Sequence, residues 1–393
     1  MKQKWKTFDF ILVFTPILLV CFGIIMIYSA SMVTSVLDDK PATFYMMKQL
    51  MWFGIGMIGF LFCCFFNYRF YQKIMKFIIF ALIVLLIAVL IFSESINGSR
   101  SWLQFGGVSL QPSEFVKLGL IMYLASIYSK KQDYIEDFSK AVLPPLVMTA
   151  FLLGLIVLQP DIGTASIIFL IACSVIFSAG IKFKHLSILM IIGIVIILLG
   201  ATQMVTPERI SRFTGAYQPF DDPDADGYHL IQSYIAIGTG GITGQGLGQG
   251  VQKLGYLSEP HTDFIMAVIA EELGFIGAIL VIGMLALIVL RGIYISRLCE
   301  DNFGALLAIG ISSMIGIQTF INLGAISGLL PITGVPLPFV SYGGSSLLVL
   351  LISVGILNNI ARRVKSQTMN KEVVMEETTL MNKQFTVKNR QGI

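Results

Sequence analysis

The stretch Tyr256-Leu257-Ser258-Glu259-Pro260-His261-Thr262-Asp263-Phe264 decides how the rest of this sequence is interpreted. It is polar and acidic, it follows the longest hydrophilic segment of the chain, and an apolar run from Phe264 to Leu290 begins directly after it. A carboxylate at the mouth of an apolar helix lies where water meets hydrocarbon, and its charge costs free energy there unless it is hydrated, paired or in use. We therefore predict that Asp263 is a functional carboxylate, with helix capping as the ordinary alternative.

The composition is that of a polytopic membrane protein. The 393 residues are 55% hydrophobic and 13% charged, and the mean hydropathy is +0.81. A soluble globular domain contains roughly 25% charged residues, so we expect most of the surface to face lipid. The five cysteines lie in or beside apolar runs without zinc-like spacing, which indicates core residues rather than a metal site.

Apolar runs of about 20 residues are typical of membrane-spanning helices. Their number predicts an all-α protein with ten transmembrane helices and both termini on one side of the membrane. The expected spans are roughly 8–32, 46–66, 73–93, 112–129, 141–158, 162–180, 184–203, 264–290, 303–327 and 343–361. We expect residues 1–363 to form this domain and the polar tail 364–393 to be a disordered cytoplasmic extension.

The distribution of Lys and Arg predicts the orientation. One set of connections, which includes both termini, contains most of the basic residues, and the opposite set contains far fewer. By the positive-inside rule, both termini are cytoplasmic and the large loop 204–263 between helices 7 and 8 is extracellular. The shorter connections 94–111, 159–161 and 328–342 are expected on the same outer side.

The outer loop and the helix that follows it contain further charged and glycine-rich segments. Arg209 and Arg212 share a face if helical, and arginine suits bidentate phosphate binding, although a hydrated loop is an equal alternative. Gly238–Gly250 contains seven glycines but follows no strand, so we expect close backbone packing or loop motion rather than a dinucleotide site.

Glu271 and Glu272 lie about 12–14 Å into the apolar run. They predict a polar cavity or a buried pairing, and we favour pairing with a cation for Glu272.

Three other positions on the outer side place polar residues at helix ends. Pro112 or Ser113 is expected to start a helix on which Glu114 and Lys117 share a face, as a neutralised bridge or as a charge presented to a substrate. Asp161 is expected to cap the next helix or to line a cavity. Three prolines and several glycines break any helix between Ser327 and Gly344, so this segment must be buried in protein or line a wet cavity.

These motifs together resemble the SEDS family, the shape, elongation, division and sporulation proteins typified by FtsW, RodA and SpoVE. The family signature matches without departure, and the resemblance covers about residues 8–363. The matching segments are Asn322, Gly328, Pro331, Gly334 and Ser341-Tyr342-Gly343-Gly344-Ser345-Ser346, with Asn97-Gly98, Gln111-Pro112-Ser113-Glu114, Gln159-Pro160-Asp161 and His261-Thr262-Asp263-Phe264. The phrase Gln252-Lys253-Leu254-Gly255-Tyr256-Leu257 is most similar to the division branch.

The resemblance implies a peptidoglycan glycosyltransferase of the bacterial cell membrane that polymerises lipid II, an undecaprenyl-pyrophosphate disaccharide-peptide. It implies Asp263 as the catalytic residue. The residues expected to bind substrate are Arg100, Trp102, Glu114, Lys117, Asp161, Arg209, Arg212, Glu259, His261, Thr262, Ser341 and Tyr342. It also implies a class B penicillin-binding protein transpeptidase and other division proteins as partners, enrichment at the septum, and assistance by a divalent cation such as Mg²⁺ or Mn²⁺. No organic cofactor, metal-ligand set or nucleic acid is expected.

The chemistry of that reaction assigns roles to these residues. The acceptor GlcNAc 4-hydroxyl attacks the donor MurNAc anomeric carbon, and one inverting displacement suffices. Asp263 is expected to take the hydroxyl proton, while Arg209, Arg212, Arg100 or Lys117 offset charge on the departing pyrophosphate. Two alternatives stay open: a lipid II flippase with Glu114, Lys117 and Asp161 along its path, and a division scaffold that recruits a transpeptidase.

Overall fold

The structure is a computed structural model. It describes residues 8–93, 100–105, 108–132, 135, 137–181, 215–221 and 227–391, together with isolated positions between 187 and 198. Beyond Met369, the side chain of Lys371 alone is described. Arg209, Arg212 and most of the expected seventh span, 184–203, lie outside these residues.

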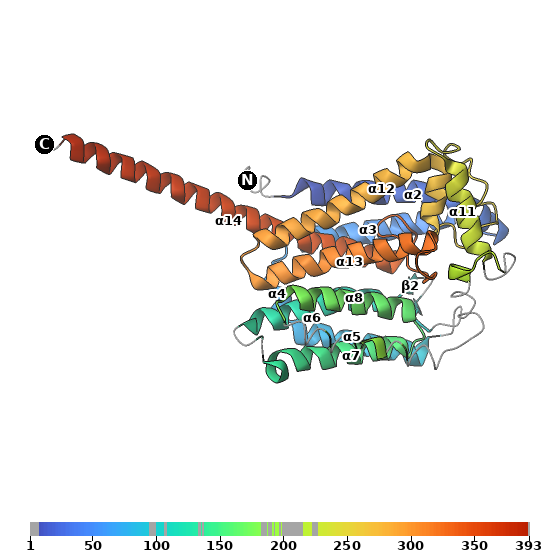
Figure 1. The fold of residues 1–393 in the computed structure, drawn as a ribbon, viewed down its shortest axis with the longest axis horizontal. Coiled ribbons are helices and arrows are strands. Elements are labelled where there is room, and N and C mark those ends of the chain that lie inside the picture. Colours follow the sequence, from blue (N-terminus) through green and yellow to red (C-terminus); the bar gives the residue numbers. More distant parts are fainter. Residues whose placement is uncertain are drawn as a thin grey trace.

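The described chain forms a bundle of long helices with one small antiparallel hairpin (Figure 1). In chain order the elements are α2 (Phe10–Leu37), α3 (Phe44–Phe65), α4 (Arg69–Lys73), α5 (Met75–Phe92), β1 (Leu103–Phe105), β2 (Val108–Leu110), α6 (Pro112–Lys130), the π-helix η2 (Phe138–Val142), α7 (Leu143–Val157), α8 (Ile162–Ser178), α11 (Tyr228–Gly240), α12 (Ile265–Leu298), α13 (Asn302–Ile326) and α14 (Gly344–Gln391). The hairpin and α11 lie in connections that the sequence analysis left without secondary structure.

The helical class and the membrane-spanning character of the prediction are confirmed. Seven of the described helices are long and apolar enough to cross a membrane, and α8 is a shorter apolar helix. Most of them begin and end close to the expected boundaries, and α6 begins at Pro112 as the sequence predicts, whereas α12 and α14 extend beyond their expected ends to Leu298 and Gln391. The total of ten spans stays a prediction, because most of the seventh expected span is not described.

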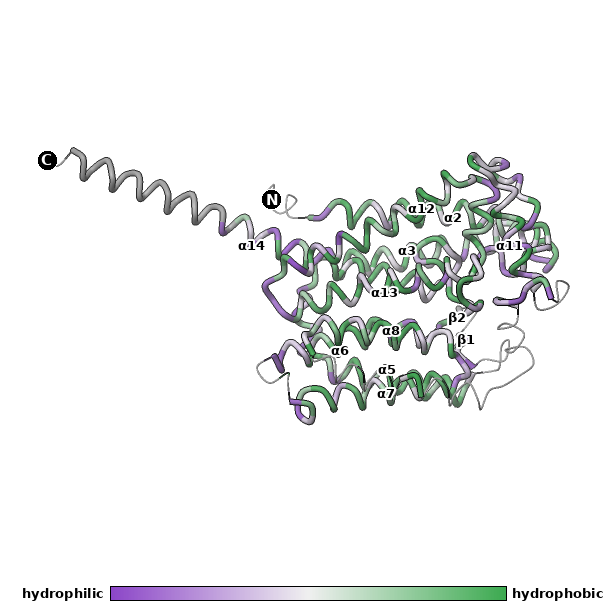
Figure 2. Tube along the Cα trace, in the orientation of Figure 1, coloured by the Kyte–Doolittle hydropathy of each residue, from purple (hydrophilic) through white to green (hydrophobic). Residues whose placement is uncertain are grey.

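The packing places α6 at the centre of the bundle, in contact with α5, α7, α8, α13 and α14. α3 packs along α14, and α12 packs along both α13 and α2. Green apolar stretches cover most of the helix lengths in Figure 2, and purple polar stretches gather at the ends and in the connections. The backbone N–H and C=O groups of the helices are thus satisfied by hydrogen bonds within each helix. The apolar side chains face neighbouring helices or the outside of the bundle.

The connections that contain the candidate residues gather at one end of the bundle. α11, the hairpin and the start of α12 lie at this end, whereas α2 begins and α14 leaves the bundle at the opposite end (Figure 1). We call the first of these the loop end. α14 continues past the expected tenth span to Gln391 and projects away from the bundle. A helix without packing partners is only marginally stable, and disorder of the tail 364–393 stays a prediction.

The expected eighth span is wrong in one respect: α12 is not one continuous helix. Gly274 has φ +67° and ψ −163°, which divides α12 into a nine-residue segment, 265–273, and a long helix from residue 275. The glycine-rich segment 241–246 fills the break. The amides of Gln245 and Gly246 donate to the carbonyls of Glu271 and Glu272, and the amides of Phe275 and Ile276 donate to the carbonyls of Gly241 and Ile242. The expected close packing of the glycine-rich segment is confirmed.

Candidate functional site

Asp263 lies at the loop end, directly before the short first segment of α12. The N-cap of α12 is Phe264, whose side chain makes no capping hydrogen bond, and the capping role of Thr262 or Asp263 stays a prediction. The Asp263 side chain is half-buried. A Cβ built on Gly334 would lie 3.7 Å from Asp263 Oδ2, so the proline-rich segment passes close to this carboxylate.

Three successive carbonyl oxygens before α12 accept hydrogen bonds from residues of the signature. The backbone amide of Tyr342 donates to the carbonyl of His261 at 2.8 Å. The Ser341 hydroxyl donates to the carbonyl of Thr262 at 2.6 Å. The Asn322 side-chain amide donates to the carbonyl of Asp263 at 2.8 Å. The segment that contains Asp263 is therefore fixed to α13 and to the turn before α14.

The turn that contains Ser341 is itself anchored to α3. Gln49 is buried, its Nε2 donates to the carbonyl of Ser341 at 3.2 Å, and its Oε1 accepts from the amide of Gly343 at 3.3 Å. Within the turn, the amide of Leu337 donates to Ser341 Oγ at 2.8 Å. A side chain of the second expected span thus supports the signature.

Two aromatic side chains enclose His261. Its ring centroid lies 4.2 Å from that of Tyr45 and 5.7 Å from that of Tyr342. Burial lowers the pKa of His261 from its ordinary value, although the charges of Glu259 and Asp38 act in the opposite direction. The imidazole is therefore favoured in its neutral form at pH 7.

Glu259 and Thr262 belong to the same loop. Glu259 is exposed, with φ +48°, and its side chain and carbonyl both accept from the Thr262 hydroxyl at 3.1 Å. The structure therefore brings Glu259, His261 and Thr262 together around Asp263, with Ser341 and Tyr342 beside them. Their expected contacts with substrate stay predictions.

Glu114 and Lys117 form a buried ion pair on α6. Their charged atoms are 2.7 Å apart, and both side chains are almost fully buried. The i,i+3 prediction is confirmed in its neutralised form. Taking two charges out of water is costly unless they are closely paired, so the charge of Lys117 is already compensated.

Asp161 caps α8, as the sequence predicts. Its Oδ1 accepts from the amide of Thr164 at 3.0 Å, and its Oδ2 accepts from Gln111 Nε2 at 3.2 Å. Burial raises the pKa of Asp161, and the charges of Glu114 and Lys117 act on it in opposite directions. A Cβ on Gly163, in the first turn of α8, would lie 2.8 Å from the carbonyl of Thr333. The proline-rich segment thus contacts both the start of α8 and the surroundings of Asp263.

Four buried polar atoms that have no hydrogen-bond partner in the described part of the chain were not predicted from the sequence. They are Ser113 Oγ, both amide atoms of Gln318, and Thr333 Oγ1. Buried polar groups are normally satisfied by protein or by water, so each of these atoms is a position suited to a bound water or a polar ligand atom. Gln318, a polar residue inside the expected ninth span, is the signal in the sequence that indicated it.

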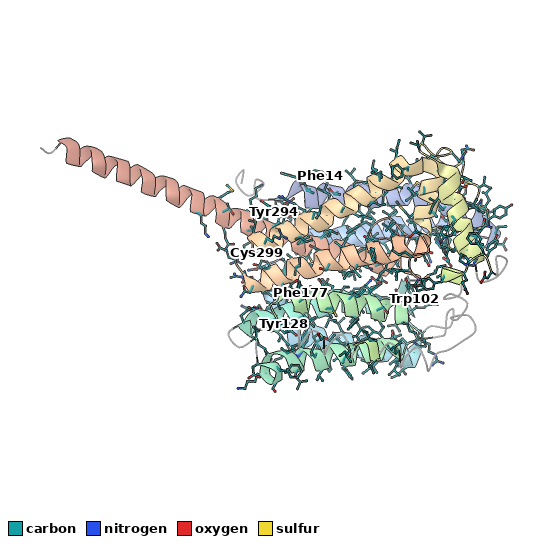
Figure 3. The ribbon with its side chains drawn as sticks, in the orientation of Figure 1. Phe14, Trp102, Tyr128, Phe177, Tyr294 and Cys299 are labelled. Atoms are coloured by element: carbon teal, nitrogen blue, oxygen red, sulfur yellow. The ribbon has the colours of Figure 1, made fainter. Side chains whose placement is uncertain are left out.

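Arg100 and Trp102 precede the hairpin at the same end. The amide of Arg100 donates to the carbonyl of Gln159 at 3.2 Å, and the residue is exposed. The carbonyl of Trp102 accepts from Ser93 at 2.9 Å. Figure 3 labels Trp102 at the loop end, with Tyr294 and Cys299 toward the opposite end.

Glu271 and Glu272 hold the connection between α11 and α12 rather than line a cavity. Glu272 Oε1 lies 2.5 Å from Lys253 Nζ and accepts from the Ser29 hydroxyl at 2.7 Å. Glu271 accepts from the amides of Val251 and Gln252. The favoured pairing of Glu272 with a cation is confirmed, and Lys253, a loop residue in the sequence, is its buried partner.

The described residues contain no group of three or more His, Cys, Asp or Glu side chains that could hold a metal ion. The expected divalent cation has no ligand set in this part of the chain. We therefore derive no catalytic step through such a cation.

Comparison with known proteins gives the family. A family described as "Cell cycle protein", which comprises FtsW, RodA and SpoVE, matches residues 9–366. This chain belongs to the FtsW, RodA and SpoVE family. The predicted resemblance is confirmed over nearly the whole of the expected transmembrane domain.

Relatives of the family are similar to this chain over nearly their full length. "Probable peptidoglycan glycosyltransferase FtsW" of Bacillus subtilis (strain 168) is 47% identical over 98% of both chains. "Stage V sporulation protein E" of the same organism is 42% identical over 92% of this chain and 99% of that protein. A solved structure described as "Structural coordination of polymerization and crosslinking by a peptidoglycan synthase complex" has a TM-score of 0.73 and 27% identity, and covers 91% of this chain and 98% of that one.

Proposed function

We propose that this family member is a peptidoglycan glycosyltransferase that polymerises lipid II into glycan strands for septal wall synthesis. One observation carries the proposal: the half-buried Asp263 lies at the loop end, in a backbone segment that Asn322 and Ser341 of the family signature hold by hydrogen bonds. The names of the similar FtsW proteins support the activity and the division role.

In the proposed reaction, Asp263 acts as general base. It takes the proton of the acceptor sugar hydroxyl while the hydroxyl oxygen forms a bond to the anomeric carbon of the donor. The bond from that carbon to the pyrophosphate oxygen breaks with inversion, and the electron pair leaves with the polyprenyl pyrophosphate. General base catalysis of this kind is typically worth about 10²–10⁴-fold in rate.

The departing pyrophosphate needs positive charge near it. Arg100 is exposed at the loop end, whereas the charge of Lys117 is already paired with Glu114. We therefore favour Arg100 over Lys117 for this role, with Arg209 and Arg212 as further candidates from the outer loop. Trp102 and Asp161 are proposed to contact the sugar-peptide head.

The proposal includes an orientation and a partner. The loop end faces the outside of a bacterial cell membrane, where the head group of lipid II lies, and both termini are cytoplasmic. A class B penicillin-binding protein transpeptidase is proposed as partner, since a similar solved structure is described as coordinating polymerization and crosslinking. We also propose that the protein is enriched at the septum and that it has other division proteins as partners.

The test is polymerisation of purified lipid II by the purified protein, alone and with its transpeptidase. Asp263→Ala is expected to reduce glycan synthesis by at least about 10²-fold, because the base is absent. Asp137→Ala is the matched control, since Asp137 caps η2, remote from the loop end, and its loss affects only local stability.

Other outcomes identify the alternatives. If Asp263→Ala polymerises lipid II at the wild-type rate, the proposed role is wrong. Exchange of fluorescent lipid II between vesicle leaflets without strand growth indicates a flippase. Normal septation by cells with Asp263→Asn indicates a scaffold.

A further inference from the structure

We propose that Asn322 and Ser341 are positioning residues that hold the Asp263 carboxylate in register, so that this part of the signature is a backbone clamp rather than a substrate contact. The inference rests on the proposed function of Asp263. It assigns a physical role to two signature residues that lie 59 and 79 positions from the carbonyls they bind.

The clamp holds the segment directly before the short first part of α12. Phe264, the N-cap of α12, offers no side-chain acceptor, and α12 is interrupted after nine residues at Gly274. A short helix of this length is marginal alone. Residues of the signature donate hydrogen bonds to the carbonyls of residues 261–263. These bonds therefore fix the position of the Asp263 backbone.

Asn322 uses both hydrogens of its side-chain amide. Nδ2 donates to the carbonyl of Asp263 and to the carbonyl of Val335, each at 2.8 Å. The opposite amide orientation would place Oδ1 against two carbonyl oxygens, so the hydrogen-bond network determines the assignment. Val335 follows Gly334, whose Cβ position faces the Asp263 carboxylate at 3.7 Å. One amide thus joins the backbone of Asp263 to the segment that flanks its side chain.

The Ser341 hydroxyl makes two hydrogen bonds within the protein, one as donor and one as acceptor. Its hydroxyl donates to the carbonyl of Thr262 at 2.6 Å and accepts from the amide of Leu337 at 2.8 Å, and the residue is buried. A hydroxyl has a single hydrogen to donate, and here the Thr262 carbonyl takes it. A direct donor role toward substrate would break the clamp.

The consequence for catalysis is geometric. A general base must lie within about 3 Å of the proton that it abstracts, and a misplacement of about 1 Å can cost about 10²-fold in rate. Loss of one clamp hydrogen bond removes neither the carboxylate nor any other substrate-binding side chain. It lets the backbone segment that contains Asp263 shift. The effect is expected in kcat, with KM largely unchanged.

The experiment compares variants at two buried serines. Each variant is purified as the full chain and assayed with lipid II. Ser341→Ala is expected to lower kcat about 10–100-fold with KM within about twofold of wild type. Ser353→Ala is the matched control, because the Ser353 hydroxyl is also buried but donates only to the carbonyl of Val349 in its own helix. Its kcat and KM are expected to stay at the wild-type values. Ser341→Thr, which keeps the hydroxyl, is expected to restore most of kcat.

A second pair of variants keeps the test decisive if Ser341→Ala does not fold. Ser341→Cys keeps the side-chain volume with a weaker donor and is expected to lower kcat in the same way. Asn322→Asp replaces the amide nitrogen, which donates one hydrogen to each of two carbonyls, with an oxygen that faces both, and is expected to lower kcat at least as far as Ser341→Ala.

The outcomes separate this inference from the proposed function. Wild-type kcat in Ser341→Ala overturns the clamp. If KM is raised while kcat is unchanged, the result favours direct substrate contact instead. If Asp263→Ala is inactive while Ser341→Ala equals Ser353→Ala, the clamp alone fails. If Asp263→Ala is fully active, the proposed function itself fails.

Discussion

At the scale of single residues, the buried pair of Lys253 and Glu272 shows how this protein holds charge near a membrane. The side chains are 2% and 0% exposed, and Ser29 bonds to both of them. The amide of Gly248 also donates to Glu272, at 2.9 Å. Such a pair adds little net stability over apolar residues, but breaking it leaves an uncompensated buried charge. Its role here is to tie the connection before α12 to α2 and α12.

Removal of one partner is expected to cost more than removal of both. Lys253→Met should lower the free energy of unfolding by about 3–5 kcal/mol, because the Glu272 carboxyl group is then buried without its cation. The double variant Lys253→Met with Glu272→Met should recover part of that loss. Thermal unfolding in one fixed detergent measures both.

The exposed pair of Lys140 and Asp137 provides the control. Lys140→Met should hardly move the unfolding temperature, because exposed ion pairs contribute little. A double variant less stable than Lys253→Met would contradict the account of the buried pair.

At the scale of elements, the broken helix α12 is the feature that shapes the site. A break in a helix beside a membrane exposes carbonyls and amides that must find partners. The glycine-rich segment 241–246 supplies them, because its backbone can approach where a side chain would collide. A Cβ on Gly274 would lie 2.4 Å from the amide nitrogen of Gly244, and one on Gly244 would lie 2.2 Å from the carbonyl oxygen of Glu272.

Gly274→Ala is therefore expected to be strongly destabilising. The conformation at Gly274 is one that only glycine adopts readily, and forcing it costs about 1–3 kcal/mol before the collision with Gly244 is included. Lower thermal stability and faster proteolysis within 241–254 are the expected observations.

Gly283→Ala, in the same helix, is the matched control. A Cβ there meets nothing within 4 Å. It should leave stability unchanged or raise it by up to about 1 kcal/mol, since alanine favours a helix. Equal unfolding temperatures for the two variants would count against the account of the break.

At the scale of the whole molecule, polar chemistry is concentrated at one end. The start of α2 and the exit of α14 lie at the other end, which agrees with an even number of crossings (Figure 1). The candidate residues that the structure describes belong to connections or helix starts at the loop end. In the proposed orientation, the head of a lipid-linked substrate lies at this end.

The orientation can be tested by labelling single cysteines after replacement of the five native ones. Cysteine at Leu254, which is 48% exposed in the outer loop, should react with a membrane-impermeant maleimide in intact cells. Cysteine at Ser366, exposed on α14, should react only after permeabilisation. The reverse pattern would contradict the proposed topology.

Much of this protein was determined by the sequence alone, because the relevant physics is local. Apolar run lengths predict the spans, the i,i+3 spacing predicts the Glu114–Lys117 pair, and Asp161 before an apolar run predicts a cap. The prolines between Ser327 and Gly344 predict a segment without helix, which the structure confirms.

Only the tertiary structure decided which distant segments meet. Hydropathy makes 264–290 one continuous span, whereas the backbone of 241–246 divides it at Gly274. Spacing cannot pair Lys253 with Glu272, nor Asn322 with the carbonyl of Asp263, since neither pair shares a helix face. Packing of whole helices sets these contacts, and a buried polar group is stable only where that packing supplies its partner.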